Sequence, residues 1–251
     1  MAGMSGTIDI RVFDTLPELM QAAAEEVVRG AAQAVRDRGC FAWALSGGST
    51  PRDLYRLLSG PLYRDRLPWS DIHVFWGDER HVPPEDPDSN FRMAREAMLD
   101  AVPLPAANIH RIHAEEPDAE VAAKAYETEL REFFHLPIGE WPRFDLILLG
   151  LGKDAHTASL FPSGEAVHER ERMVVAPWVE AQNTFRITLT PPVLNGARLV
   201  VFLTAGDDKA EPLRAVLEGA RDPSRYPAQI VEGNRLWLVD RAAARLLATA
   251  A

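Results

Sequence analysis

Four short apolar runs constrain the fold of this chain more than any other feature of its sequence, because each ends abruptly in a polar or glycine-rich turn. They are residues 41–45, 72–76, 144–149 and 199–203. Short, predominantly apolar runs are typical of strands buried on both faces of a parallel sheet. The sequence therefore predicts an α/β fold with these strands in its sheet.

Segments of helical periodicity alternate with the strands for most of the length. Thr15 and Glu18 form a capping-box pattern that begins a helix, and Gly39 ends that helix near Arg38. Further strands are expected at 8–13, 108–112, 173–176, 185–189 and 236–239, and further helices from 51, at 90–100, 117–134, 209–217 and 242–250. This alternation predicts a largely parallel sheet covered by helices on both faces.

Composition and charge exclude several classes of protein. The chain has 251 residues without a long linker or internal repeat, so we expect one domain over 1–251, with residues 1–7 as a loose N-terminus. A formal net charge of −10 argues against a nucleic-acid partner, and the lack of any apolar run of about 18 residues argues against a membrane span. We expect a cytoplasmic protein, because no signal-peptide pattern opens the chain. A monomer is the default, because no heptad marks an interface.

The segment SGGSTP (46–51) follows the second strand directly and leads into a helix. Strand, glycine-rich turn and helix together direct backbone N–H groups and a positive helix end toward one point. The hydroxyls of Ser46, Ser49 and Thr50, beside Gly47 and Gly48, add further donors. The segment predicts a phosphate site; the alternative is a tight turn with a helix cap. It matches neither the dinucleotide nor the P-loop pattern, so no nucleotide is indicated.

Two further strand ends carry charged residues. Asp78, Glu79, Arg80 and His81 follow the strand at 72–76 and form either a solvated loop or a site. Of these, Arg80 is the candidate for contact with an anionic ligand, whereas Glu79 and His81 are expected to structure the loop. Lys209 stands at a third strand-to-helix junction.

The most informative loop follows the strand at 144–149. Gly150 and Gly152 allow a sharp turn, after which come four polar residues, Asp154, His156, Thr157 and Ser159. A histidine with a carboxylate two residues before it is a candidate general base with an orienting partner. The alternative is a helix-start histidine that satisfies local backbone groups.

These loops can meet in space. Right-handed crossovers place every strand-to-helix loop at one edge of a parallel sheet, where ligands bind in open α/β folds. We therefore expect the glycine-rich loop, the Asp78–Arg80 cluster, the His156 loop and Lys209 to line one crevice. In the strand at 185–189, Arg186 and Thr188 are expected on the face opposite Ile187.

Four segments together resemble the 6-phosphogluconolactonases of the glucosamine-6-phosphate isomerase/6-phosphogluconolactonase family. They are ALSGGSTPRDLY (44–55), FWGDERHVPPEDPDSNFRMA (75–94), LGLGKDAHTASLFP (149–162) and RITLTPPVLNGARLVVFLTAGDDKA (186–210). The resemblance runs in order from about residue 8 to the end. It implies a modified Rossmann-like α/β/α sandwich, shared with glucosamine-6-phosphate deaminase and ribose-5-phosphate isomerase.

The resemblance also implies an activity: hydrolysis of 6-phospho-D-glucono-1,5-lactone to 6-phosphogluconate in the oxidative pentose phosphate pathway. A lactone is an activated ester, so neither a metal nor any other cofactor is expected. His156 is then the base for water, and Asp154 or Asp78 assists it or holds sugar hydroxyls. Phosphate is expected on the loop of Ser46, Gly47, Gly48, Ser49 and Thr50, with Arg80, Thr157, Arg186 and Lys209 as further contacts.

One departure from the family pattern and three alternatives remain open. The family usually has glycine before the histidine, where this chain has Ala155; a positive φ there would strain alanine by about 1 kcal/mol or more. The first alternative is a deaminase on the same fold. That family usually carries a glutamate where this chain has SLFP (159–162), so this chain would lack one of its acid/base groups. The second alternative is covalent catalysis with Ser159 as the nucleophile, but no GxSxG elbow surrounds this residue. The third alternative is a non-catalytic sugar-phosphate sensor, which would need no general base.

Overall fold

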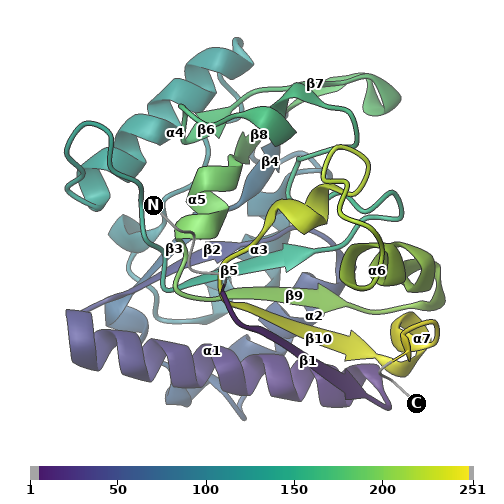
Figure 1. Ribbon diagram of the computed structural model, residues 1–251. Coiled ribbons are helices and arrows are strands. Elements are labelled where there is room, and N and C mark those ends of the chain that lie inside the picture. The colour runs from purple at the N-terminus through teal and green to yellow at the C-terminus, as the bar shows by residue number, and fades with distance from the viewer. Residues whose placement is uncertain (1–5, 249–251) are drawn as a thin grey trace.

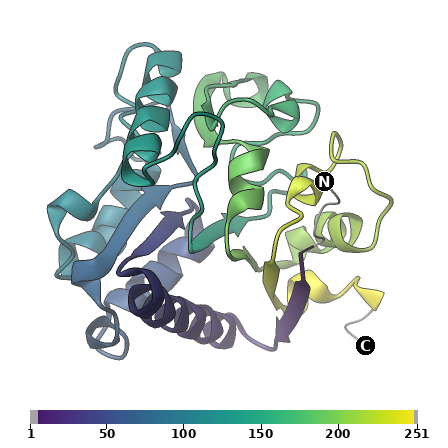
Figure 2. The same ribbon diagram turned by 60° about the vertical axis from the view of Figure 1, so that its left-hand side comes forward.

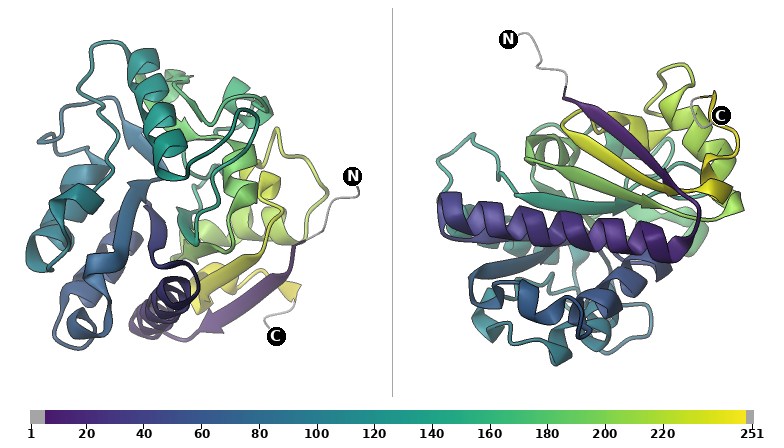
Figure 3. Two further views of the ribbon diagram at one scale, coloured as in Figure 1. Left: turned by 90° about the vertical axis from the view of Figure 1, so that its left-hand side faces the viewer. Right: turned by 90° about the horizontal axis from the view of Figure 1, so that it is seen from below.

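The structure, a computed structural model, describes residues 6–248 and is built on a six-stranded sheet (Figure 1). Its strand order is β1-β10-β9-β5-β2-β3, and every pairing is parallel. The strands of this sheet are β1 (Ile8–Phe13), β2 (Phe41–Leu45), β3 (Ile72–Trp76), β5 (Leu146–Gly150), β9 (Val200–Thr204) and β10 (Arg235–Asp240). Figure 3 shows β1, in purple, beside β10, in yellow, although the two lie at opposite ends of the chain. The predicted parallel sheet is confirmed.

Helices flank the sheet on both sides, and the strands of a second sheet lie on one of these sides (Figure 1). The helices are α1 (Leu16–Arg38), α2 (Ser49–Ser59), α3 (Asn90–Ala97), α4 (Ala119–Phe133), α5 (Pro191–Gly196), α6 (Ala210–Leu217) and α7 (Arg241–Ala244). Figure 2 shows α1 below the sheet and α5 above it. The predicted start of α1 is confirmed in detail, because Thr15 and Glu18 form both hydrogen bonds of a capping box and Gly39 ends the helix at φ 82°.

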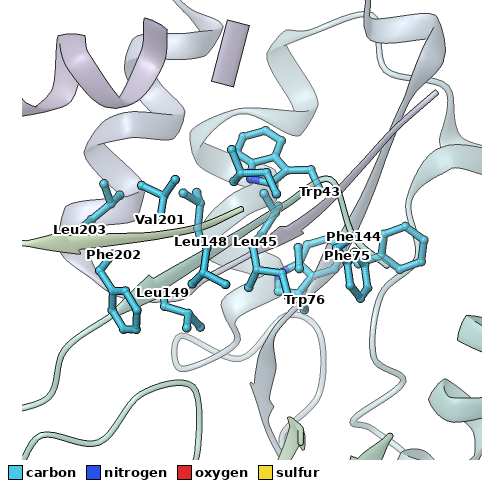
Figure 4. Close-up of a cluster of buried hydrophobic side chains, with 14 of the residues drawn as sticks. Trp43, Leu45, Phe75, Trp76, Phe144, Leu148, Leu149, Val201, Phe202 and Leu203 are labelled. Atoms are coloured by element: carbon cyan, nitrogen blue, oxygen red, sulfur yellow. The ribbon is translucent and has the colours of Figure 1, made fainter. Parts of the chain in front are cut away.

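Large side chains from the central strands fill the core on both faces of the sheet. In Figure 4, Val201 and Leu203 point to one face of β9 and Phe202 points to the other. The ring of Phe202 stacks on that of Trp237 with a centroid distance of 3.8 Å. Full burial of each such side chain contributes about 1.5–3 kcal/mol, which explains why these strands are predominantly apolar. The rigid sheet then presents its loops at a fixed edge.

A second, antiparallel sheet was not predicted. Its order is β4-β8-β6, with β7 paired to β8, and its strands are β4 (Asp78–Arg80), β6 (Val174–Val175), β7 (Trp178–Val179) and β8 (Thr184–Leu189). The charged cluster after β3 is therefore a strand and not a solvated loop. Three charged or polar residues carry no strand periodicity, and β4 exists because β8, far away in sequence, supplies its hydrogen bonds.

Other elements differ from expectation mainly at their ends. Helix α2 begins two residues before Pro51, and the strand expected at 108–112 is reduced to a single bridge between Ile109 and Val74. The terminal helix α7 ends at Ala244; residues 249 and 250 of the expected helix lie outside the described range. The same holds for residues 1–5 of the expected loose N-terminus. Gly6 and Thr7, in contrast, are held by hydrogen bonds to Glu232 and Asn234.

Within residues 6–248, no helix combines the length and apolar composition needed to cross a membrane.

Candidate active site

A cavity of about 250 Å³ lies at the carboxyl ends of β2, β5 and β9. This is the position at which ligands bind in open α/β sheets. The residues that line it include Ser46, Gly47, Gly48, Ser49, Thr50, Asp78, Arg80, Asn90, Gly152, His156 and Lys209. The predicted convergence of the glycine-rich loop, the Asp78–Arg80 cluster, the His156 loop and Lys209 is confirmed.

The glycine-rich loop places the N-terminus of α2 in the wall of this cavity. Gly48 is the N-cap at φ 103°, and no side chain caps the helix, so the first-turn N–H groups remain available for an anion. A Cβ on Gly47 would lie 1.9 Å from Oδ1 of Asn90, so only glycine fits there. The Tyr55 hydroxyl fixes the loop, because it donates to the Ser46 carbonyl at 2.8 Å and accepts from the Ser46 N–H at 2.9 Å.

The candidate base is oriented by its neighbour two residues earlier. Nδ1 of His156 lies 2.5 Å from Oδ1 of Asp154, so the pair does reach, and Nε2 is the ring nitrogen left for substrate. Burial opposes ionisation of Asp154, but the hydrogen bonds and charge of His156 outweigh it and lower the pKa of the carboxyl. The ring of Phe161 packs against the imidazole with a centroid distance of 4.4 Å. The imidazole is thus held on two sides.

Backbone hydrogen bonds fold the 152–156 loop into a compact turn. The Gly152 N–H donates to the His156 carbonyl at 2.8 Å, and the Ala155 N–H donates to the Gly152 carbonyl at 3.0 Å. Thr157 is buried, does not line the cavity, and donates its hydroxyl to the Gly150 carbonyl at 2.9 Å. The structure thus places Thr157 where it supports the loop.

Gly152 is required by the histidine that it faces. A Cβ on Gly152 would lie 2.1 Å from Nδ1 of His156 and 2.7 Å from Oδ1 of Asp154. We expect Gly152→Ala to lower kcat by about 100-fold. The added Cβ would displace the His156 imidazole, and a displacement of about 1 Å at a catalytic group lowers the rate by about that factor. Steady-state kinetics on purified variant and wild type measure the effect.

The matched control for that variant is Gly30→Ala in α1, where the added Cβ meets Phe41 at an ordinary 3.6 Å. It should retain full activity. Equal activity of Gly152→Ala and wild type would contradict the placement of the imidazole.

Ala155 adopts φ 64°, which is the left-handed region that the family's usual glycine would occupy without strain. We expect Ala155→Gly to raise the free energy of unfolding by about 0.5–1 kcal/mol, because the strain relieved exceeds the entropy that glycine adds to the unfolded chain. Urea unfolding measures the gain. Ala123→Gly in α4 is the control and should destabilise by about 1 kcal/mol. A loss of stability in Ala155→Gly would show that this φ carries no strain.

Asp78 is held at the cavity by residues from two other elements. Its Oδ2 accepts from the Ser159 hydroxyl at 2.7 Å, and its carbonyl accepts from Nδ2 of Asn90 at 2.9 Å. Ser159 is therefore occupied with Asp78 and is not presented as a nucleophile. Asn90 lines the cavity and was missed, although its position directly after the Ser89 N-cap marks the start of α3.

Cations gather on the Asp78 side of the cavity. Arg80 and Arg186 are opposite each other in the β4–β8 pairing, and the Nε atom of each is buried without a hydrogen-bond partner in the described chain. Burial and the charge of Arg80 lower the pKa of Arg186. Arg186 does not line the cavity, whereas Lys209 does and also pairs with Asp208 at 3.4 Å. Two arginines this close favour an anion nearby.

Glu79 points away from the cavity and caps α3. Its carboxylate accepts from the N–H groups of Asn90 at 2.7 Å, Phe91 at 2.8 Å and Arg80 at 2.8 Å. Burial raises its pKa to about 7, although these hydrogen bonds act in the opposite direction. Nε2 of His81 contacts the Glu116 carbonyl at 2.7 Å. Both residues structure the loop, as expected.

Within residues 6–248, no group of three or more His, Cys, Asp or Glu side chains is placed to hold a metal ion.

Comparison with known proteins gives concordant matches. The family model described as glucosamine-6-phosphate isomerases/6-phosphogluconolactonase matches residues 14–239. The 6-phosphogluconolactonase of Synechocystis is 47% identical over 213 residues, which cover 84% of this chain and 86% of that protein. The solved 6-phosphogluconolactonase of Trypanosoma brucei is 31% identical with a TM-score of 0.84, covering 97% of this chain and 100% of that one. A monomeric glucosamine-6-phosphate deaminase, 20% identical with a TM-score of 0.80 and covering 95% of this chain and 99% of that one, shares the fold.

Proposed function

Since the chain belongs to the glucosamine-6-phosphate isomerase/6-phosphogluconolactonase family and has the 6-phosphogluconolactonase activity of the pentose phosphate pathway, we propose that His156 is the general base of lactone hydrolysis. The observation that carries this assignment is the 2.5 Å contact between Nδ1 of His156 and Asp154 at the cavity wall. It leaves Nε2 for the reacting water. A base with this partner contributes about 10²–10⁴ in rate.

The proposed steps balance without a covalent intermediate. Nε2 of His156 takes a proton from water as the water oxygen bonds to C1, and the carbonyl electrons move to the exocyclic oxygen. The exocyclic oxygen then re-forms the C1 carbonyl as the bond from C1 to the ring oxygen breaks, and the imidazolium returns the proton to that ring oxygen. Asp154 stabilises the imidazolium while it exists, as an ionised carboxylate does in other base–carboxylate pairs.

The phosphate of the substrate would lie at the N-terminus of α2. The free N–H groups there, with the hydroxyls of Ser49 and Thr50, supply donors, and Lys209 and Arg80 supply charge. Arg186 would act through Arg80, its cross-strand neighbour. These local cations would be needed to attract the phosphate, because the chain as a whole carries a net charge of −10.

Asp78 and Asn90 would face the sugar hydroxyls. Both line the cavity, and Asp78 is held in place by Ser159 and Asn90. A carboxylate accepts hydrogen bonds only, so Asp78 would select hydroxyl donors of the substrate. Ser46 and Thr157 would support the two loops. We further propose that the enzyme acts as a single-domain cytoplasmic monomer.

The test generates the lactone in situ from glucose 6-phosphate and follows its loss with and without the protein, beside the unphosphorylated lactone. We expect accelerated loss of the phosphorylated lactone alone. The N-terminus of α2 and Lys209 would bind its phosphate group, which the unphosphorylated lactone lacks. Equal action on both lactones would overturn the phosphate site. No acceleration of either would favour a sensor or a deaminase on the same fold.

A further inference from the structure

A second cavity, of about 740 Å³, lies behind the catalytic pair. One wall is the segment from Phe161 to Ala166, and the opposite wall runs from Pro177 through β7 to Ala181. Figure 1 shows β7 beside β8 on the side of the sheet opposite α1. Asp154 belongs to this lining, yet no residue is shared with the lactone cavity described above. The two cavities can therefore be filled at the same time.

The walls of this second cavity are apolar and partly aromatic. They include Phe161, Pro162, Pro177 and Trp178. Trp178 is 47% exposed, which is unusual for so large an apolar side chain, and its ring packs edge-on against Phe185 at 5.0 Å. Nε1 of Trp178 donates to Oε2 of Glu180 at 2.8 Å, so the indole is held in place with a face accessible. Cavities of this size and character bind small organic molecules.

The charges of the lining have one sign. Asp154, Glu165 and Glu180 all line the cavity, whereas no lysine, arginine or histidine of the described chain does. Among residues 6–248, Asp154 is the one carboxylate of the three with a cationic partner, namely His156. An aromatic face beside uncompensated carboxylates favours a cation, because both the ring quadrupole and the carboxylates attract it. A neutral or anionic ligand of the same shape would gain neither interaction.

We propose that this second cavity binds a small organic cation with a flat apolar body. The body lies between Phe161 and Trp178, and the charge faces Glu165 and Glu180. The lactone cavity has a separate lining, although Asp154, which contacts His156, also lines this second cavity.

The test uses benzamidine as the probe, with benzamide and benzoate as neutral and anionic compounds of matched shape. Calorimetric titration of the full chain should show binding of benzamidine at least about 10-fold tighter than of either control. The dissociation constant should not change when 6-phosphogluconate saturates the lactone cavity. Equal affinity for benzamide, or competition by 6-phosphogluconate, would overturn the proposal.

Two variants locate the site. Glu165→Gln with Glu180→Gln should weaken benzamidine binding by about 10-fold, and Trp178→Leu by about 2- to 30-fold. The matched control, Glu132→Gln with Glu140→Gln, removes the same charge from exposed positions outside the cavity and should leave the affinity unchanged. Equal weakening in both double variants would show that only net charge matters and would overturn the site. Wild-type affinity in the Glu165/Glu180 variant would overturn it as well.

Discussion

Replacing His156 with alanine is expected to lower kcat for lactone hydrolysis by about 10²–10⁴, with a much smaller change in KM. In the proposed mechanism the imidazole would remove the water proton in the transition state, whereas the phosphate would be held by a different loop, at the N-terminus of α2. A loss confined to kcat is the result expected for a group that acts in the transition state. Steady-state kinetics with the lactone generated in situ, corrected for its spontaneous hydrolysis, measures the loss.

His113→Ala is the matched control, because His113 is an exposed histidine paired with Glu115 outside the cavity. It should retain wild-type kinetics. If His156→Ala retained full kcat, the general-base role would be wrong. A rise in KM without a fall in kcat would show instead that His156 binds substrate.

Replacing Glu79 with alanine is expected to cause the largest loss of stability, about 3 kcal/mol in the free energy of unfolding. The carboxylate accepts from three backbone N–H groups and from the Ser89 hydroxyl at 3.2 Å, and it is only 2% exposed. Alanine leaves these donors buried and unpaired. For a chain of this size the midpoint of thermal unfolding should fall by about 6–12 °C.

The size of that loss should depend on pH. Burial raises the pKa of Glu79 to about 7 in the folded protein, above the 4.5 of an ordinary glutamate. A raised folded-state pKa means that the contribution is complete below the unfolded value and is lost as the pH rises through the folded one. The difference in stability between wild type and Glu79→Ala should thus be larger at about pH 5 than at about pH 8.

Glu140→Ala controls for the loss of one exposed carboxylate and should leave stability unchanged. A pH-independent difference between wild type and Glu79→Ala would show that Glu79 does not titrate over this range. A difference below about 1 kcal/mol would contradict its role as the cap of α3.

The elements predicted most accurately from the sequence are those whose signals are local. The strands Ile8–Phe13, Phe41–Leu45 and Ile72–Trp76 match the structure to the residue, because polar or glycine-rich turns bound each of them. The start of α1 is equally local, since the capping box of Thr15 requires only Glu18. The parallel arrangement of the strands followed from the alternation of strands and helices, because parallel strands need helical crossovers.

The candidate site could be predicted only in part, because local signals identify its loops but not the residues that distant segments place in it. The loops of Ser46, His156 and Lys209 were identified because each follows a predominantly apolar strand. Asn90 was missed because it belongs to a helix whose entry into the cavity depends on Glu79 and Asp78. The contact between Asp154 and His156 could not be predicted either, because the spacing of two residues alone does not specify whether the side chains meet.

The sequence by itself determined the strands, the long helix, the parallel sheet and the loops proposed to carry the base and the phosphate donors, because hydrophobic periodicity, caps and glycines act over a few residues. Only the tertiary structure decided that Asp78–Arg80 is a strand, that Arg186 pairs with Arg80 across two strands, and that Asp154 also lines a second cavity. These features depend on pairing and packing between segments far apart in the chain. Such contacts become defined only when the sheet forms and brings the segments together.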